Sequence, residues 1–107
     1  MTIIKLSDKF GATLTGREFG KTSYAELKKG PIDMPVVLDF DGVASIGSSF
    51  ADEVVPTFAQ AQGDRIVILN ANEVVQSCLR DVRDDFGIQI ILGSRAADSS
   101  INEEGSL

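Results

Sequence analysis

The chain has 107 residues, of which 43% are hydrophobic, so it can build one domain around a single small core but is too short for two ordinary domains. Its 16 acidic and 10 basic residues give a net charge of -6, and no basic run exceeds two residues. Nucleic acids and anionic membranes attract clustered Lys and Arg, so this composition excludes both as ordinary partners.

The residue types that are missing restrict the chemistry further. Without histidine there is no Ser–His or Cys–His nucleophile pair and no His-containing zinc site. The single cysteine, Cys78, cannot form an internal disulfide, which suits a reducing compartment. No apolar stretch is long enough for a membrane span or a signal peptide. We therefore expect a cytoplasmic protein that is not an enzyme and has no cofactor or metal.

The first forty residues predict a strand, a helix and a second strand. The apolar residues between Ile3 and Leu6 favour a short strand. Thr15-Gly-Arg-Glu18 has the pattern of a capping box, in which Thr15 and Glu18 bond each other's backbone N–H groups, and a helix should follow to about Lys29 with Phe19 inward. Pro35–Phe40 is a continuous apolar run typical of a central strand that is covered on both faces.

The second half predicts two helices and two strands. Apolar residues recur at helical spacing in the first helix, at Phe50, Val54, Phe58 and Ala61. Pro56 lies inside that segment and either kinks the helix or marks its true start. Arg65–Asn70 and Ile88–Leu92 have the length and composition of buried strands. Between them we expect a helix that is capped by Asn72, ended by Gly87 and apolar along one face, at Val74, Val75, Cys78, Leu79, Val82 and Phe86.

Alternation of strands and helices predicts an α/β domain at residues 1–93. We expect a four- to five-stranded, mostly parallel sheet packed against three helices, with the first strand free to pair antiparallel at an edge. From Ser94 onward only Ile101 and Leu107 are large and apolar, so residues 94–107 should form a disordered polar tail.

The loop from Asp41 to Ser49 joins the central strand to the next helix. Parallel sheets place binding sites at such strand ends. Ser48 and Ser49 stand where the helix should begin, and there free backbone N–H groups and the helix dipole favour negative charge, including a phosphate on a serine. The alternative is structural: Ser49-Phe-Ala-Asp52 also fits a helix cap worth about 1 kcal/mol.

The stretch Val36–Val54 resembles the core of the STAS superfamily, which comprises domains of sulfate transporters and anti-sigma-factor antagonists. It is still more similar to the STAS-like family of unknown function, whose members carry a phrase like Asp-Phe-x-Gly-Val-x-x-Ile-x-x-Ser-Phe-Ala-Asp-Glu. Thr15-Gly-Arg17 is similar to that family's short Ser-Arg motif. The resemblance implies that Ser48 occupies the position phosphorylated by a partner kinase in anti-sigma-factor antagonists, although Gly47 replaces the aspartate that precedes it there.

The resemblance implies a regulatory module that docks on a protein partner through residues 41–55, with Ser48 as a switch and Ser49 as the second phosphorylation candidate. The partner it suggests is a histidine-kinase-like ATPase, and a homodimer is left open. The residues expected to contact a partner or ligand are Arg17, Asp41, Gly47, Phe50, Asp52 and Glu53.

Two alternatives use the same loop. Leu38-Asp-Phe-Asp-Gly-Val43 resembles the first motif of haloacid-dehalogenase-type phosphatases, in which two aspartates, here Asp39 and Asp41, act beside Mg²⁺. However, the chain is about half the usual length of such enzymes, and no lysine follows the motif. The other alternative is a module that binds a nucleotide or another small anion at the loop.

Overall fold

The computed structural model describes residues 1–95 and 100–107, which form seven strands and four helices. The strands are β1 (Thr2–Lys5), β2 (Thr13–Leu14), β3 (Val36–Asp39), β4 (Ser45–Ile46), β5 (Arg65–Leu69), β6 (Gln89–Arg95) and β7 (Ile101–Ser106). The helices are α1 (Leu6–Phe10), α2 (Arg17–Lys29), α3 (Ser48–Gln60) and α4 (Glu73–Phe86).

Five strands form the main sheet in the order β1-β3-β5-β6-β7, and β2 pairs with β4 in a separate two-stranded sheet. The first four strands of the main sheet are parallel, which confirms the predicted mostly parallel α/β class. The antiparallel edge strand is β7, which pairs with β6, whereas β1 pairs in parallel with β3. The suggested antiparallel pairing of the first strand is therefore wrong.

The structure also differs from the expected disordered tail at residues 94–107. Strand β6 continues to Arg95, and Ile101–Ser106 form β7 along its edge. An edge strand gains backbone hydrogen bonds without burying much apolar surface, so a polar segment can form one. Pairing with β6 continues one residue beyond β7, because the N–H of Leu107 donates to the carbonyl of Ile90 at 2.8 Å. Residues 96–99, which the same prediction included, lie outside the described residues.

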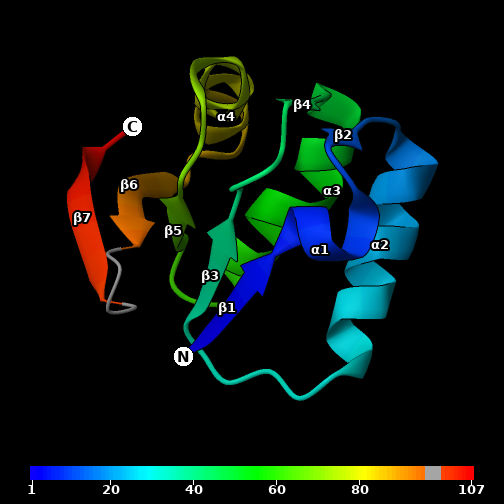
Figure 1. The fold of residues 1–107 in the computed structure, drawn as a ribbon, viewed down its shortest axis with the longest axis horizontal. Coiled ribbons are helices and arrows are strands. Elements are labelled where there is room, and N and C mark those ends of the chain that lie inside the picture. Colours follow the sequence, from blue (N-terminus) through cyan, green and yellow to red (C-terminus); the bar gives the residue numbers. More distant parts are fainter. Residues whose placement is uncertain (96–99) are drawn as a thin grey trace.

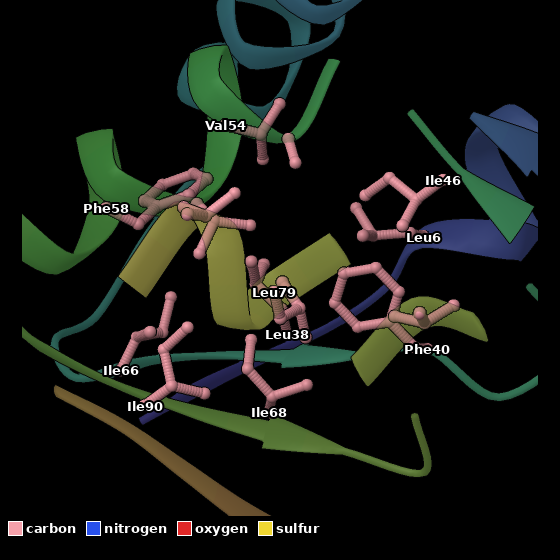
Figure 2. Close-up of a cluster of buried hydrophobic side chains, with 14 of the residues drawn as sticks. Leu6, Leu38, Phe40, Ile46, Val54, Phe58, Ile66, Ile68, Leu79 and Ile90 are labelled. Carbon is pink, nitrogen blue, oxygen red and sulfur yellow. The ribbon is translucent and has the colours of Figure 1, made fainter. Parts of the chain in front are cut away.

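The core fills the space between the sheet and the helices, which gather on one side of the main sheet (Figure 1). Alternate residues of the central strands, such as Leu38, Ile68 and Ile90, point into this space and meet side chains of α3 and α4 (Figure 2). Phe40, Phe50 and Phe58 are among its largest fully buried side chains. Burial of this one cluster is the main force that holds the helices on the sheet.

Helix α2 packs closely on α3 at a glycine. A Cβ atom at Gly20 would lie 2.9 Å from the Cβ of Glu53 and 3.0 Å from the carbonyl oxygen of Phe50, so only glycine fits there. One turn on, the rings of Tyr24 and Phe58 meet edge to face with centroids 5.0 Å apart. The two helices consequently hold their amino-terminal ends at a fixed separation.

The predicted capping box at the start of α2 is wrong. The N-cap is Gly16, with φ of 98°, and no described side chain caps the helix. Thr15 packs instead against Gly47, where a Cβ would lie 3.4 Å from the Thr15 Cγ2 atom. The left-handed backbone of Gly16 turns the chain directly into the helix and leaves Thr15 outside it.

Helix α4 begins and ends as predicted. Asn72 accepts a hydrogen bond from the N–H of Val75 at 2.8 Å, and Gly87 ends the helix in the left-handed conformation with φ of 65°. Its buried strip is narrower than expected, because Val74 and Phe86 are 59% and 40% exposed. Their assignment to the inward face is wrong.

Candidate functional site

Helix α3 starts at Ser48, after an extended Gly47. The first bond along the helix runs from the N–H of Ala51 to the carbonyl of Gly47 at 3.0 Å, which leaves the N–H groups of residues 48–50 at the helix end. Ser48 is exposed and Ser49 is half-buried. The reading of Ser49 as the helix cap is wrong, since no described side chain caps this helix. Pro56 lies inside α3 and does not mark its start.

The turn before α3 is fixed by Asp39, the last residue of β3, which is only 3% exposed. Its Oδ1 atom accepts hydrogen bonds from the backbone N–H of Asp41 at 2.9 Å and from the Nδ2 of Asn70 at 3.0 Å. Asn70 follows β5, so the carboxylate ties together the ends of two parallel strands. Asp39 therefore has a clear structural role.

The far side of the same turn is held by β1 and α1. The Ser7 hydroxyl donates to the carbonyl of Asp41 at 2.7 Å, and the Lys5 ammonium lies 3.6 Å from the Asp41 carboxylate. Gly42 has φ of 85°, and a Cβ there would lie 2.7 Å from the Ser7 Oγ atom. The turn thus requires glycine at this position.

Two further contacts hold the end of the loop. In the small sheet, β4 pairs in parallel with β2, and the Nδ2 of Asn72 donates to the carbonyls of Val43 and Ala44 at 3.2 and 3.1 Å. Because the other side-chain atom of Asn72 caps α4, this residue connects the loop to that helix. The sequence predicted the cap but gave no signal for the bonds to the loop. Ser48 is therefore presented by a tethered loop.

Helix α2 contributes the charged neighbour of this surface. The guanidinium of Arg17 lies 2.8 Å from the Oε1 atom of Glu53, with the two side chains 51% and 24% exposed. Burial raises the pKa of Asp52; the nearby Arg17 lowers it, and Asp85 and Glu53 raise it further. On α3, Ser48 and Asp52 are four residues apart, as are Ser49 and Glu53, so each pair shares a side of the helix. The structure thus brings together the predicted residues Arg17, Ser48, Ser49, Asp52 and Glu53.

Phe50 does not belong to the exposed surface, although it was a predicted contact residue. It is fully buried and supports the surface from within. The exposed aromatic residue here is Phe19, which packs between Phe10 and Phe50 at centroid distances of 5.9 and 5.2 Å and is 36% exposed. Sequence reasoning placed Phe19 in the core, because helical spacing does not distinguish the middle of an apolar face from its margin.

A family model described as a STAS-like domain of unknown function matches residues 16–76, more than half of the chain. The chain belongs to this family. The matched region of the STAS-like domain runs from the start of α2 to the first turn of α4, so it includes Arg17, the loop and all of α3. No curated protein and no solved structure matches the chain.

The STAS-like domain presents its two loop aspartates differently. Asp39 is buried at the end of β3, whereas Asp41 lies in the following turn with its side chain 65% exposed. The Asp39 carboxylate accepts hydrogen bonds from Asn70 and the Asp41 N–H, whereas the Asp41 carboxylate lies near Lys5, so the two aspartates have different surroundings. Across residues 1–95 and 100–107, no group of three or more Asp, Glu or Cys side chains could hold a metal ion.

Cys78 of the STAS-like domain lies on α4 and packs partly against the core. Burial raises the pKa of its thiol, and the carboxylates of Asp81 and Asp52 raise it further. The thiolate is therefore disfavoured, in agreement with the predicted core position. None of the described helices is both long enough and apolar enough to cross a membrane.

Proposed function

We propose that this STAS-like domain is a non-catalytic regulatory module that docks on a protein partner through the loop and helix at residues 41–55. The observation that carries the proposal is the position of Ser48: it is exposed at the first position of α3, on a loop tied to its surroundings by Asp39, Ser7 and Asn72. Such a tethered loop offers a partner a preorganised surface, which limits the entropy lost on binding.

The charge of this surface favours a basic partner. Asp41, Asp52 and Glu53 lie on or beside it, and the whole chain has a net charge of -6. Complementary charge speeds encounter and selects partners. A basic groove on the partner is therefore the matching surface.

Ser48 is the residue through which this docking would be switched. A phosphate there adds roughly -1.5 to -2 charges, which the amino-terminal end of α3 stabilises. The same phosphate would lie one turn from Asp52, whose carboxylate is already disfavoured by burial. Modification would thus change the charge of the docking surface without requiring a change of fold. By resemblance to anti-sigma-factor antagonists, the partner we propose is a histidine-kinase-like ATPase.

The test compares the affinity of Ser48→Asp, Ser48→Ala and native protein for such an ATPase isolated with the chain. We expect Ser48→Asp and Ser48→Ala to shift the dissociation constant in opposite directions, with the aspartate changing it about tenfold. Ser77→Asp is the matched control, because Ser77 is an exposed serine on the side of α4 opposite the buried Val75 and Leu79. Equal binding by both Ser48 variants would rule out the switch.

A second pair of variants tests the surface independently of Ser48. Phe19→Ala removes the exposed aromatic residue beside α3, and Phe86→Ala removes a similarly exposed aromatic residue at the end of α4. We expect the first variant to weaken binding about tenfold and the second to leave it unchanged. The reverse pattern would move the docking surface to α4.

A further inference from the structure

The main sheet has a second face, opposite the core, that carries a row of branched apolar side chains. Ile3, Val37, Val67 and Ile91 are direct neighbours in register across β1, β3, β5 and β6. Side chains alternate along a strand, so these four point away from the core residues that precede and follow them. We call this side the second face.

No helix within residues 1–95 and 100–107 covers the second face (Figure 1). Val37 and Ile91 are buried but do not belong to the core cluster, and Ile3 and Val67 are only half-buried. Helices α1 to α4 all lie on the other side of the sheet (Figure 1). Because parallel strands occur almost only in sheets covered on both faces, a row of four apolar residues here calls for a second layer.

A hollow of about 530 Å³ opens at the amino-terminal ends of β3 and β5, where Val37 and Val67 line it from the second face and Val36 and Ile66 from the core side. Its apolar walls include Met1, Pro35, Val37, Val67 and Ile101. Arg65 and Glu103 also line it, from β5 and β7 respectively. The hollow has room for large side chains from an opposing surface, and it places one cation and one anion at its margin.

Charge indicates what that opposing surface is. Both Arg65 and Glu103 are exposed, and no ion pair among the described residues uses either of them. The strand register puts three basic residues (Lys5, Arg65 and Arg95) and two acidic residues (Asp39 and Glu103) on this side, a balance of +1 in a chain of net charge -6. Lys5 also lies 3.8 Å from Asp8 and 3.6 Å from Asp41, so this side carries little net charge and two copies meet across it without strong repulsion.

We propose that the second face is the interface of a symmetric homodimer. In a two-fold interface each contact occurs twice, so Arg65 of one copy meets Glu103 of the other and the reverse pair forms as well. Ile3 and Val67, the half-buried members of the apolar row, are covered by those of the other copy. The start of α3 lies on the core side of the sheet, so the dimer leaves both Ser48 surfaces accessible and can engage a partner at two points.

The area of the second face sets the expected affinity of the dimer. Five strands at about 4.8 Å spacing and about 3.3 Å per residue make a patch of roughly 24 by 17 Å, so two copies bury on the order of 1,000 Å² in total. This lies near the lower limit for specific association. We expect a reversible dimer with a dissociation constant in the micromolar range.

The test is sedimentation velocity of the purified full chain up to about 200 µM, which spans the range expected for a small interface. The native chain should shift from monomer to dimer as its concentration rises. Val67→Lys places a charge in the apolar row and should raise the dissociation constant about tenfold or more. Val74→Lys is the matched control, because Val74 is exposed on α4, on the other side of the sheet. Circular dichroism checks that each variant is folded.

Charge reversal keeps the test decisive if Val67→Lys fails to fold. Arg65→Glu and Glu103→Arg each put like charges together and should weaken the dimer, and the double variant should restore it. A native chain that stays monomeric throughout would overturn the proposal. So would a dimer that ignores all the charge reversals or that responds to Val74→Lys instead. None of these outcomes depends on binding at Ser48, so the dimer and the docking proposal can fail separately.

Discussion

The ion pair between Arg17 and Glu53, 2.8 Å apart, joins the first turn of α2 to the second turn of α3. An ion pair this exposed contributes at most about 1 kcal/mol to folding. Its consequence is geometric: it holds the Arg17 guanidinium against a carboxylate one turn beyond the serines. A phosphate on Ser48 or Ser49 would have to compete with Glu53 for Arg17.

Gly20 should be required for the packing of α2 on α3. We expect Gly20→Ala to lower the free energy of unfolding by about 1–3 kcal/mol, because the new Cβ would lie 2.9 Å from the Glu53 Cβ and 3.0 Å from the Phe50 carbonyl oxygen. The overlap exceeds the gain of about 1 kcal/mol that alanine brings to a helix. Urea denaturation measures the change, with the exposed Lys21→Ala as control. A stabilised Gly20→Ala variant would contradict this close packing.

Asp39 should stabilise the domain through the turn that leads to α3. Asp39→Ala leaves the Asn70 amide and the Asp41 N–H without their acceptor, and we expect it to lower the free energy of unfolding by about 2–3 kcal/mol. Asp41→Ala is the control, since its side chain is 65% exposed and its ion pair with Lys5 is long, at 3.6 Å. Equal stability of the two variants in urea would show that the buried bonds contribute little.

Asp52 should make the domain less stable at neutral pH than in mild acid. Burial raises its pKa above the ordinary 3.8, with Asp85 and Glu53 adding to the effect and Arg17 opposing it. The folded chain therefore binds the proton of the Asp52 carboxyl group more tightly than the unfolded chain does. The cost of the ionised carboxylate to folding stability is fully present above the folded pKa, and it disappears as the pH falls through that pKa to 3.8 and below. We expect Asp52→Asn to raise the free energy of unfolding at neutral pH, by less than about 1 kcal/mol because the group is partly solvated.

Asp84→Asn is a control for which we expect the opposite change in the free energy of unfolding. The hydrogen bond from Arg83 lowers the pKa of Asp84, so its charge stabilises the fold above its unfolded pKa, and that stability is lost as the pH falls through the folded value. Its replacement should therefore destabilise the chain at neutral pH and have little effect in acid. Thermal unfolding followed from neutral to acid pH measures both variants. A change of the same sign for the two would contradict these assignments.

The phosphatase alternative can be tested separately. With Asp39 committed to Asn70 and the Asp41 backbone, we expect no Mg²⁺-dependent hydrolysis of a generic phosphoester above the level of an Asp39→Asn variant. Phosphate release from purified native chain and variant measures this directly. Activity that the native chain has and Asp39→Asn lacks would establish an enzyme.

Periodicity was a sufficient guide to the central elements. The runs at Pro35–Phe40 and Arg65–Asn70 have the length and β-branched composition of buried strands, and the Asn72 cap and Gly87 end of α4 follow from local backbone chemistry. Strand β7 could not be predicted, because a polar edge strand is stabilised by backbone pairing with β6 and its own side chains carry little signal. The direction in which β1 pairs with β3 also depends on contacts between distant segments, so it could not be predicted from the first strand alone.

The residue types of the candidate site could be predicted from the sequence, but the burial of each side chain could not. Helical spacing placed Phe50 and Asp52 on one segment, yet only the packing of α2 decides that Phe50 is fully buried while Phe19 is 36% exposed. Likewise, Thr15 has the sequence pattern of a capping residue, but the positive φ of Gly16 removes it from the helix start. Such outcomes depend on contacts between segments far apart in the chain.

The most direct test of the docking surface is hydrogen–deuterium exchange of the full chain with and without a bound histidine-kinase-like ATPase. If the start of α3 is the docking surface, amides at residues 41–55 should gain protection on binding, together with those near Phe19. Protection confined to α4 or β7, with residues 41–55 unchanged, would contradict it.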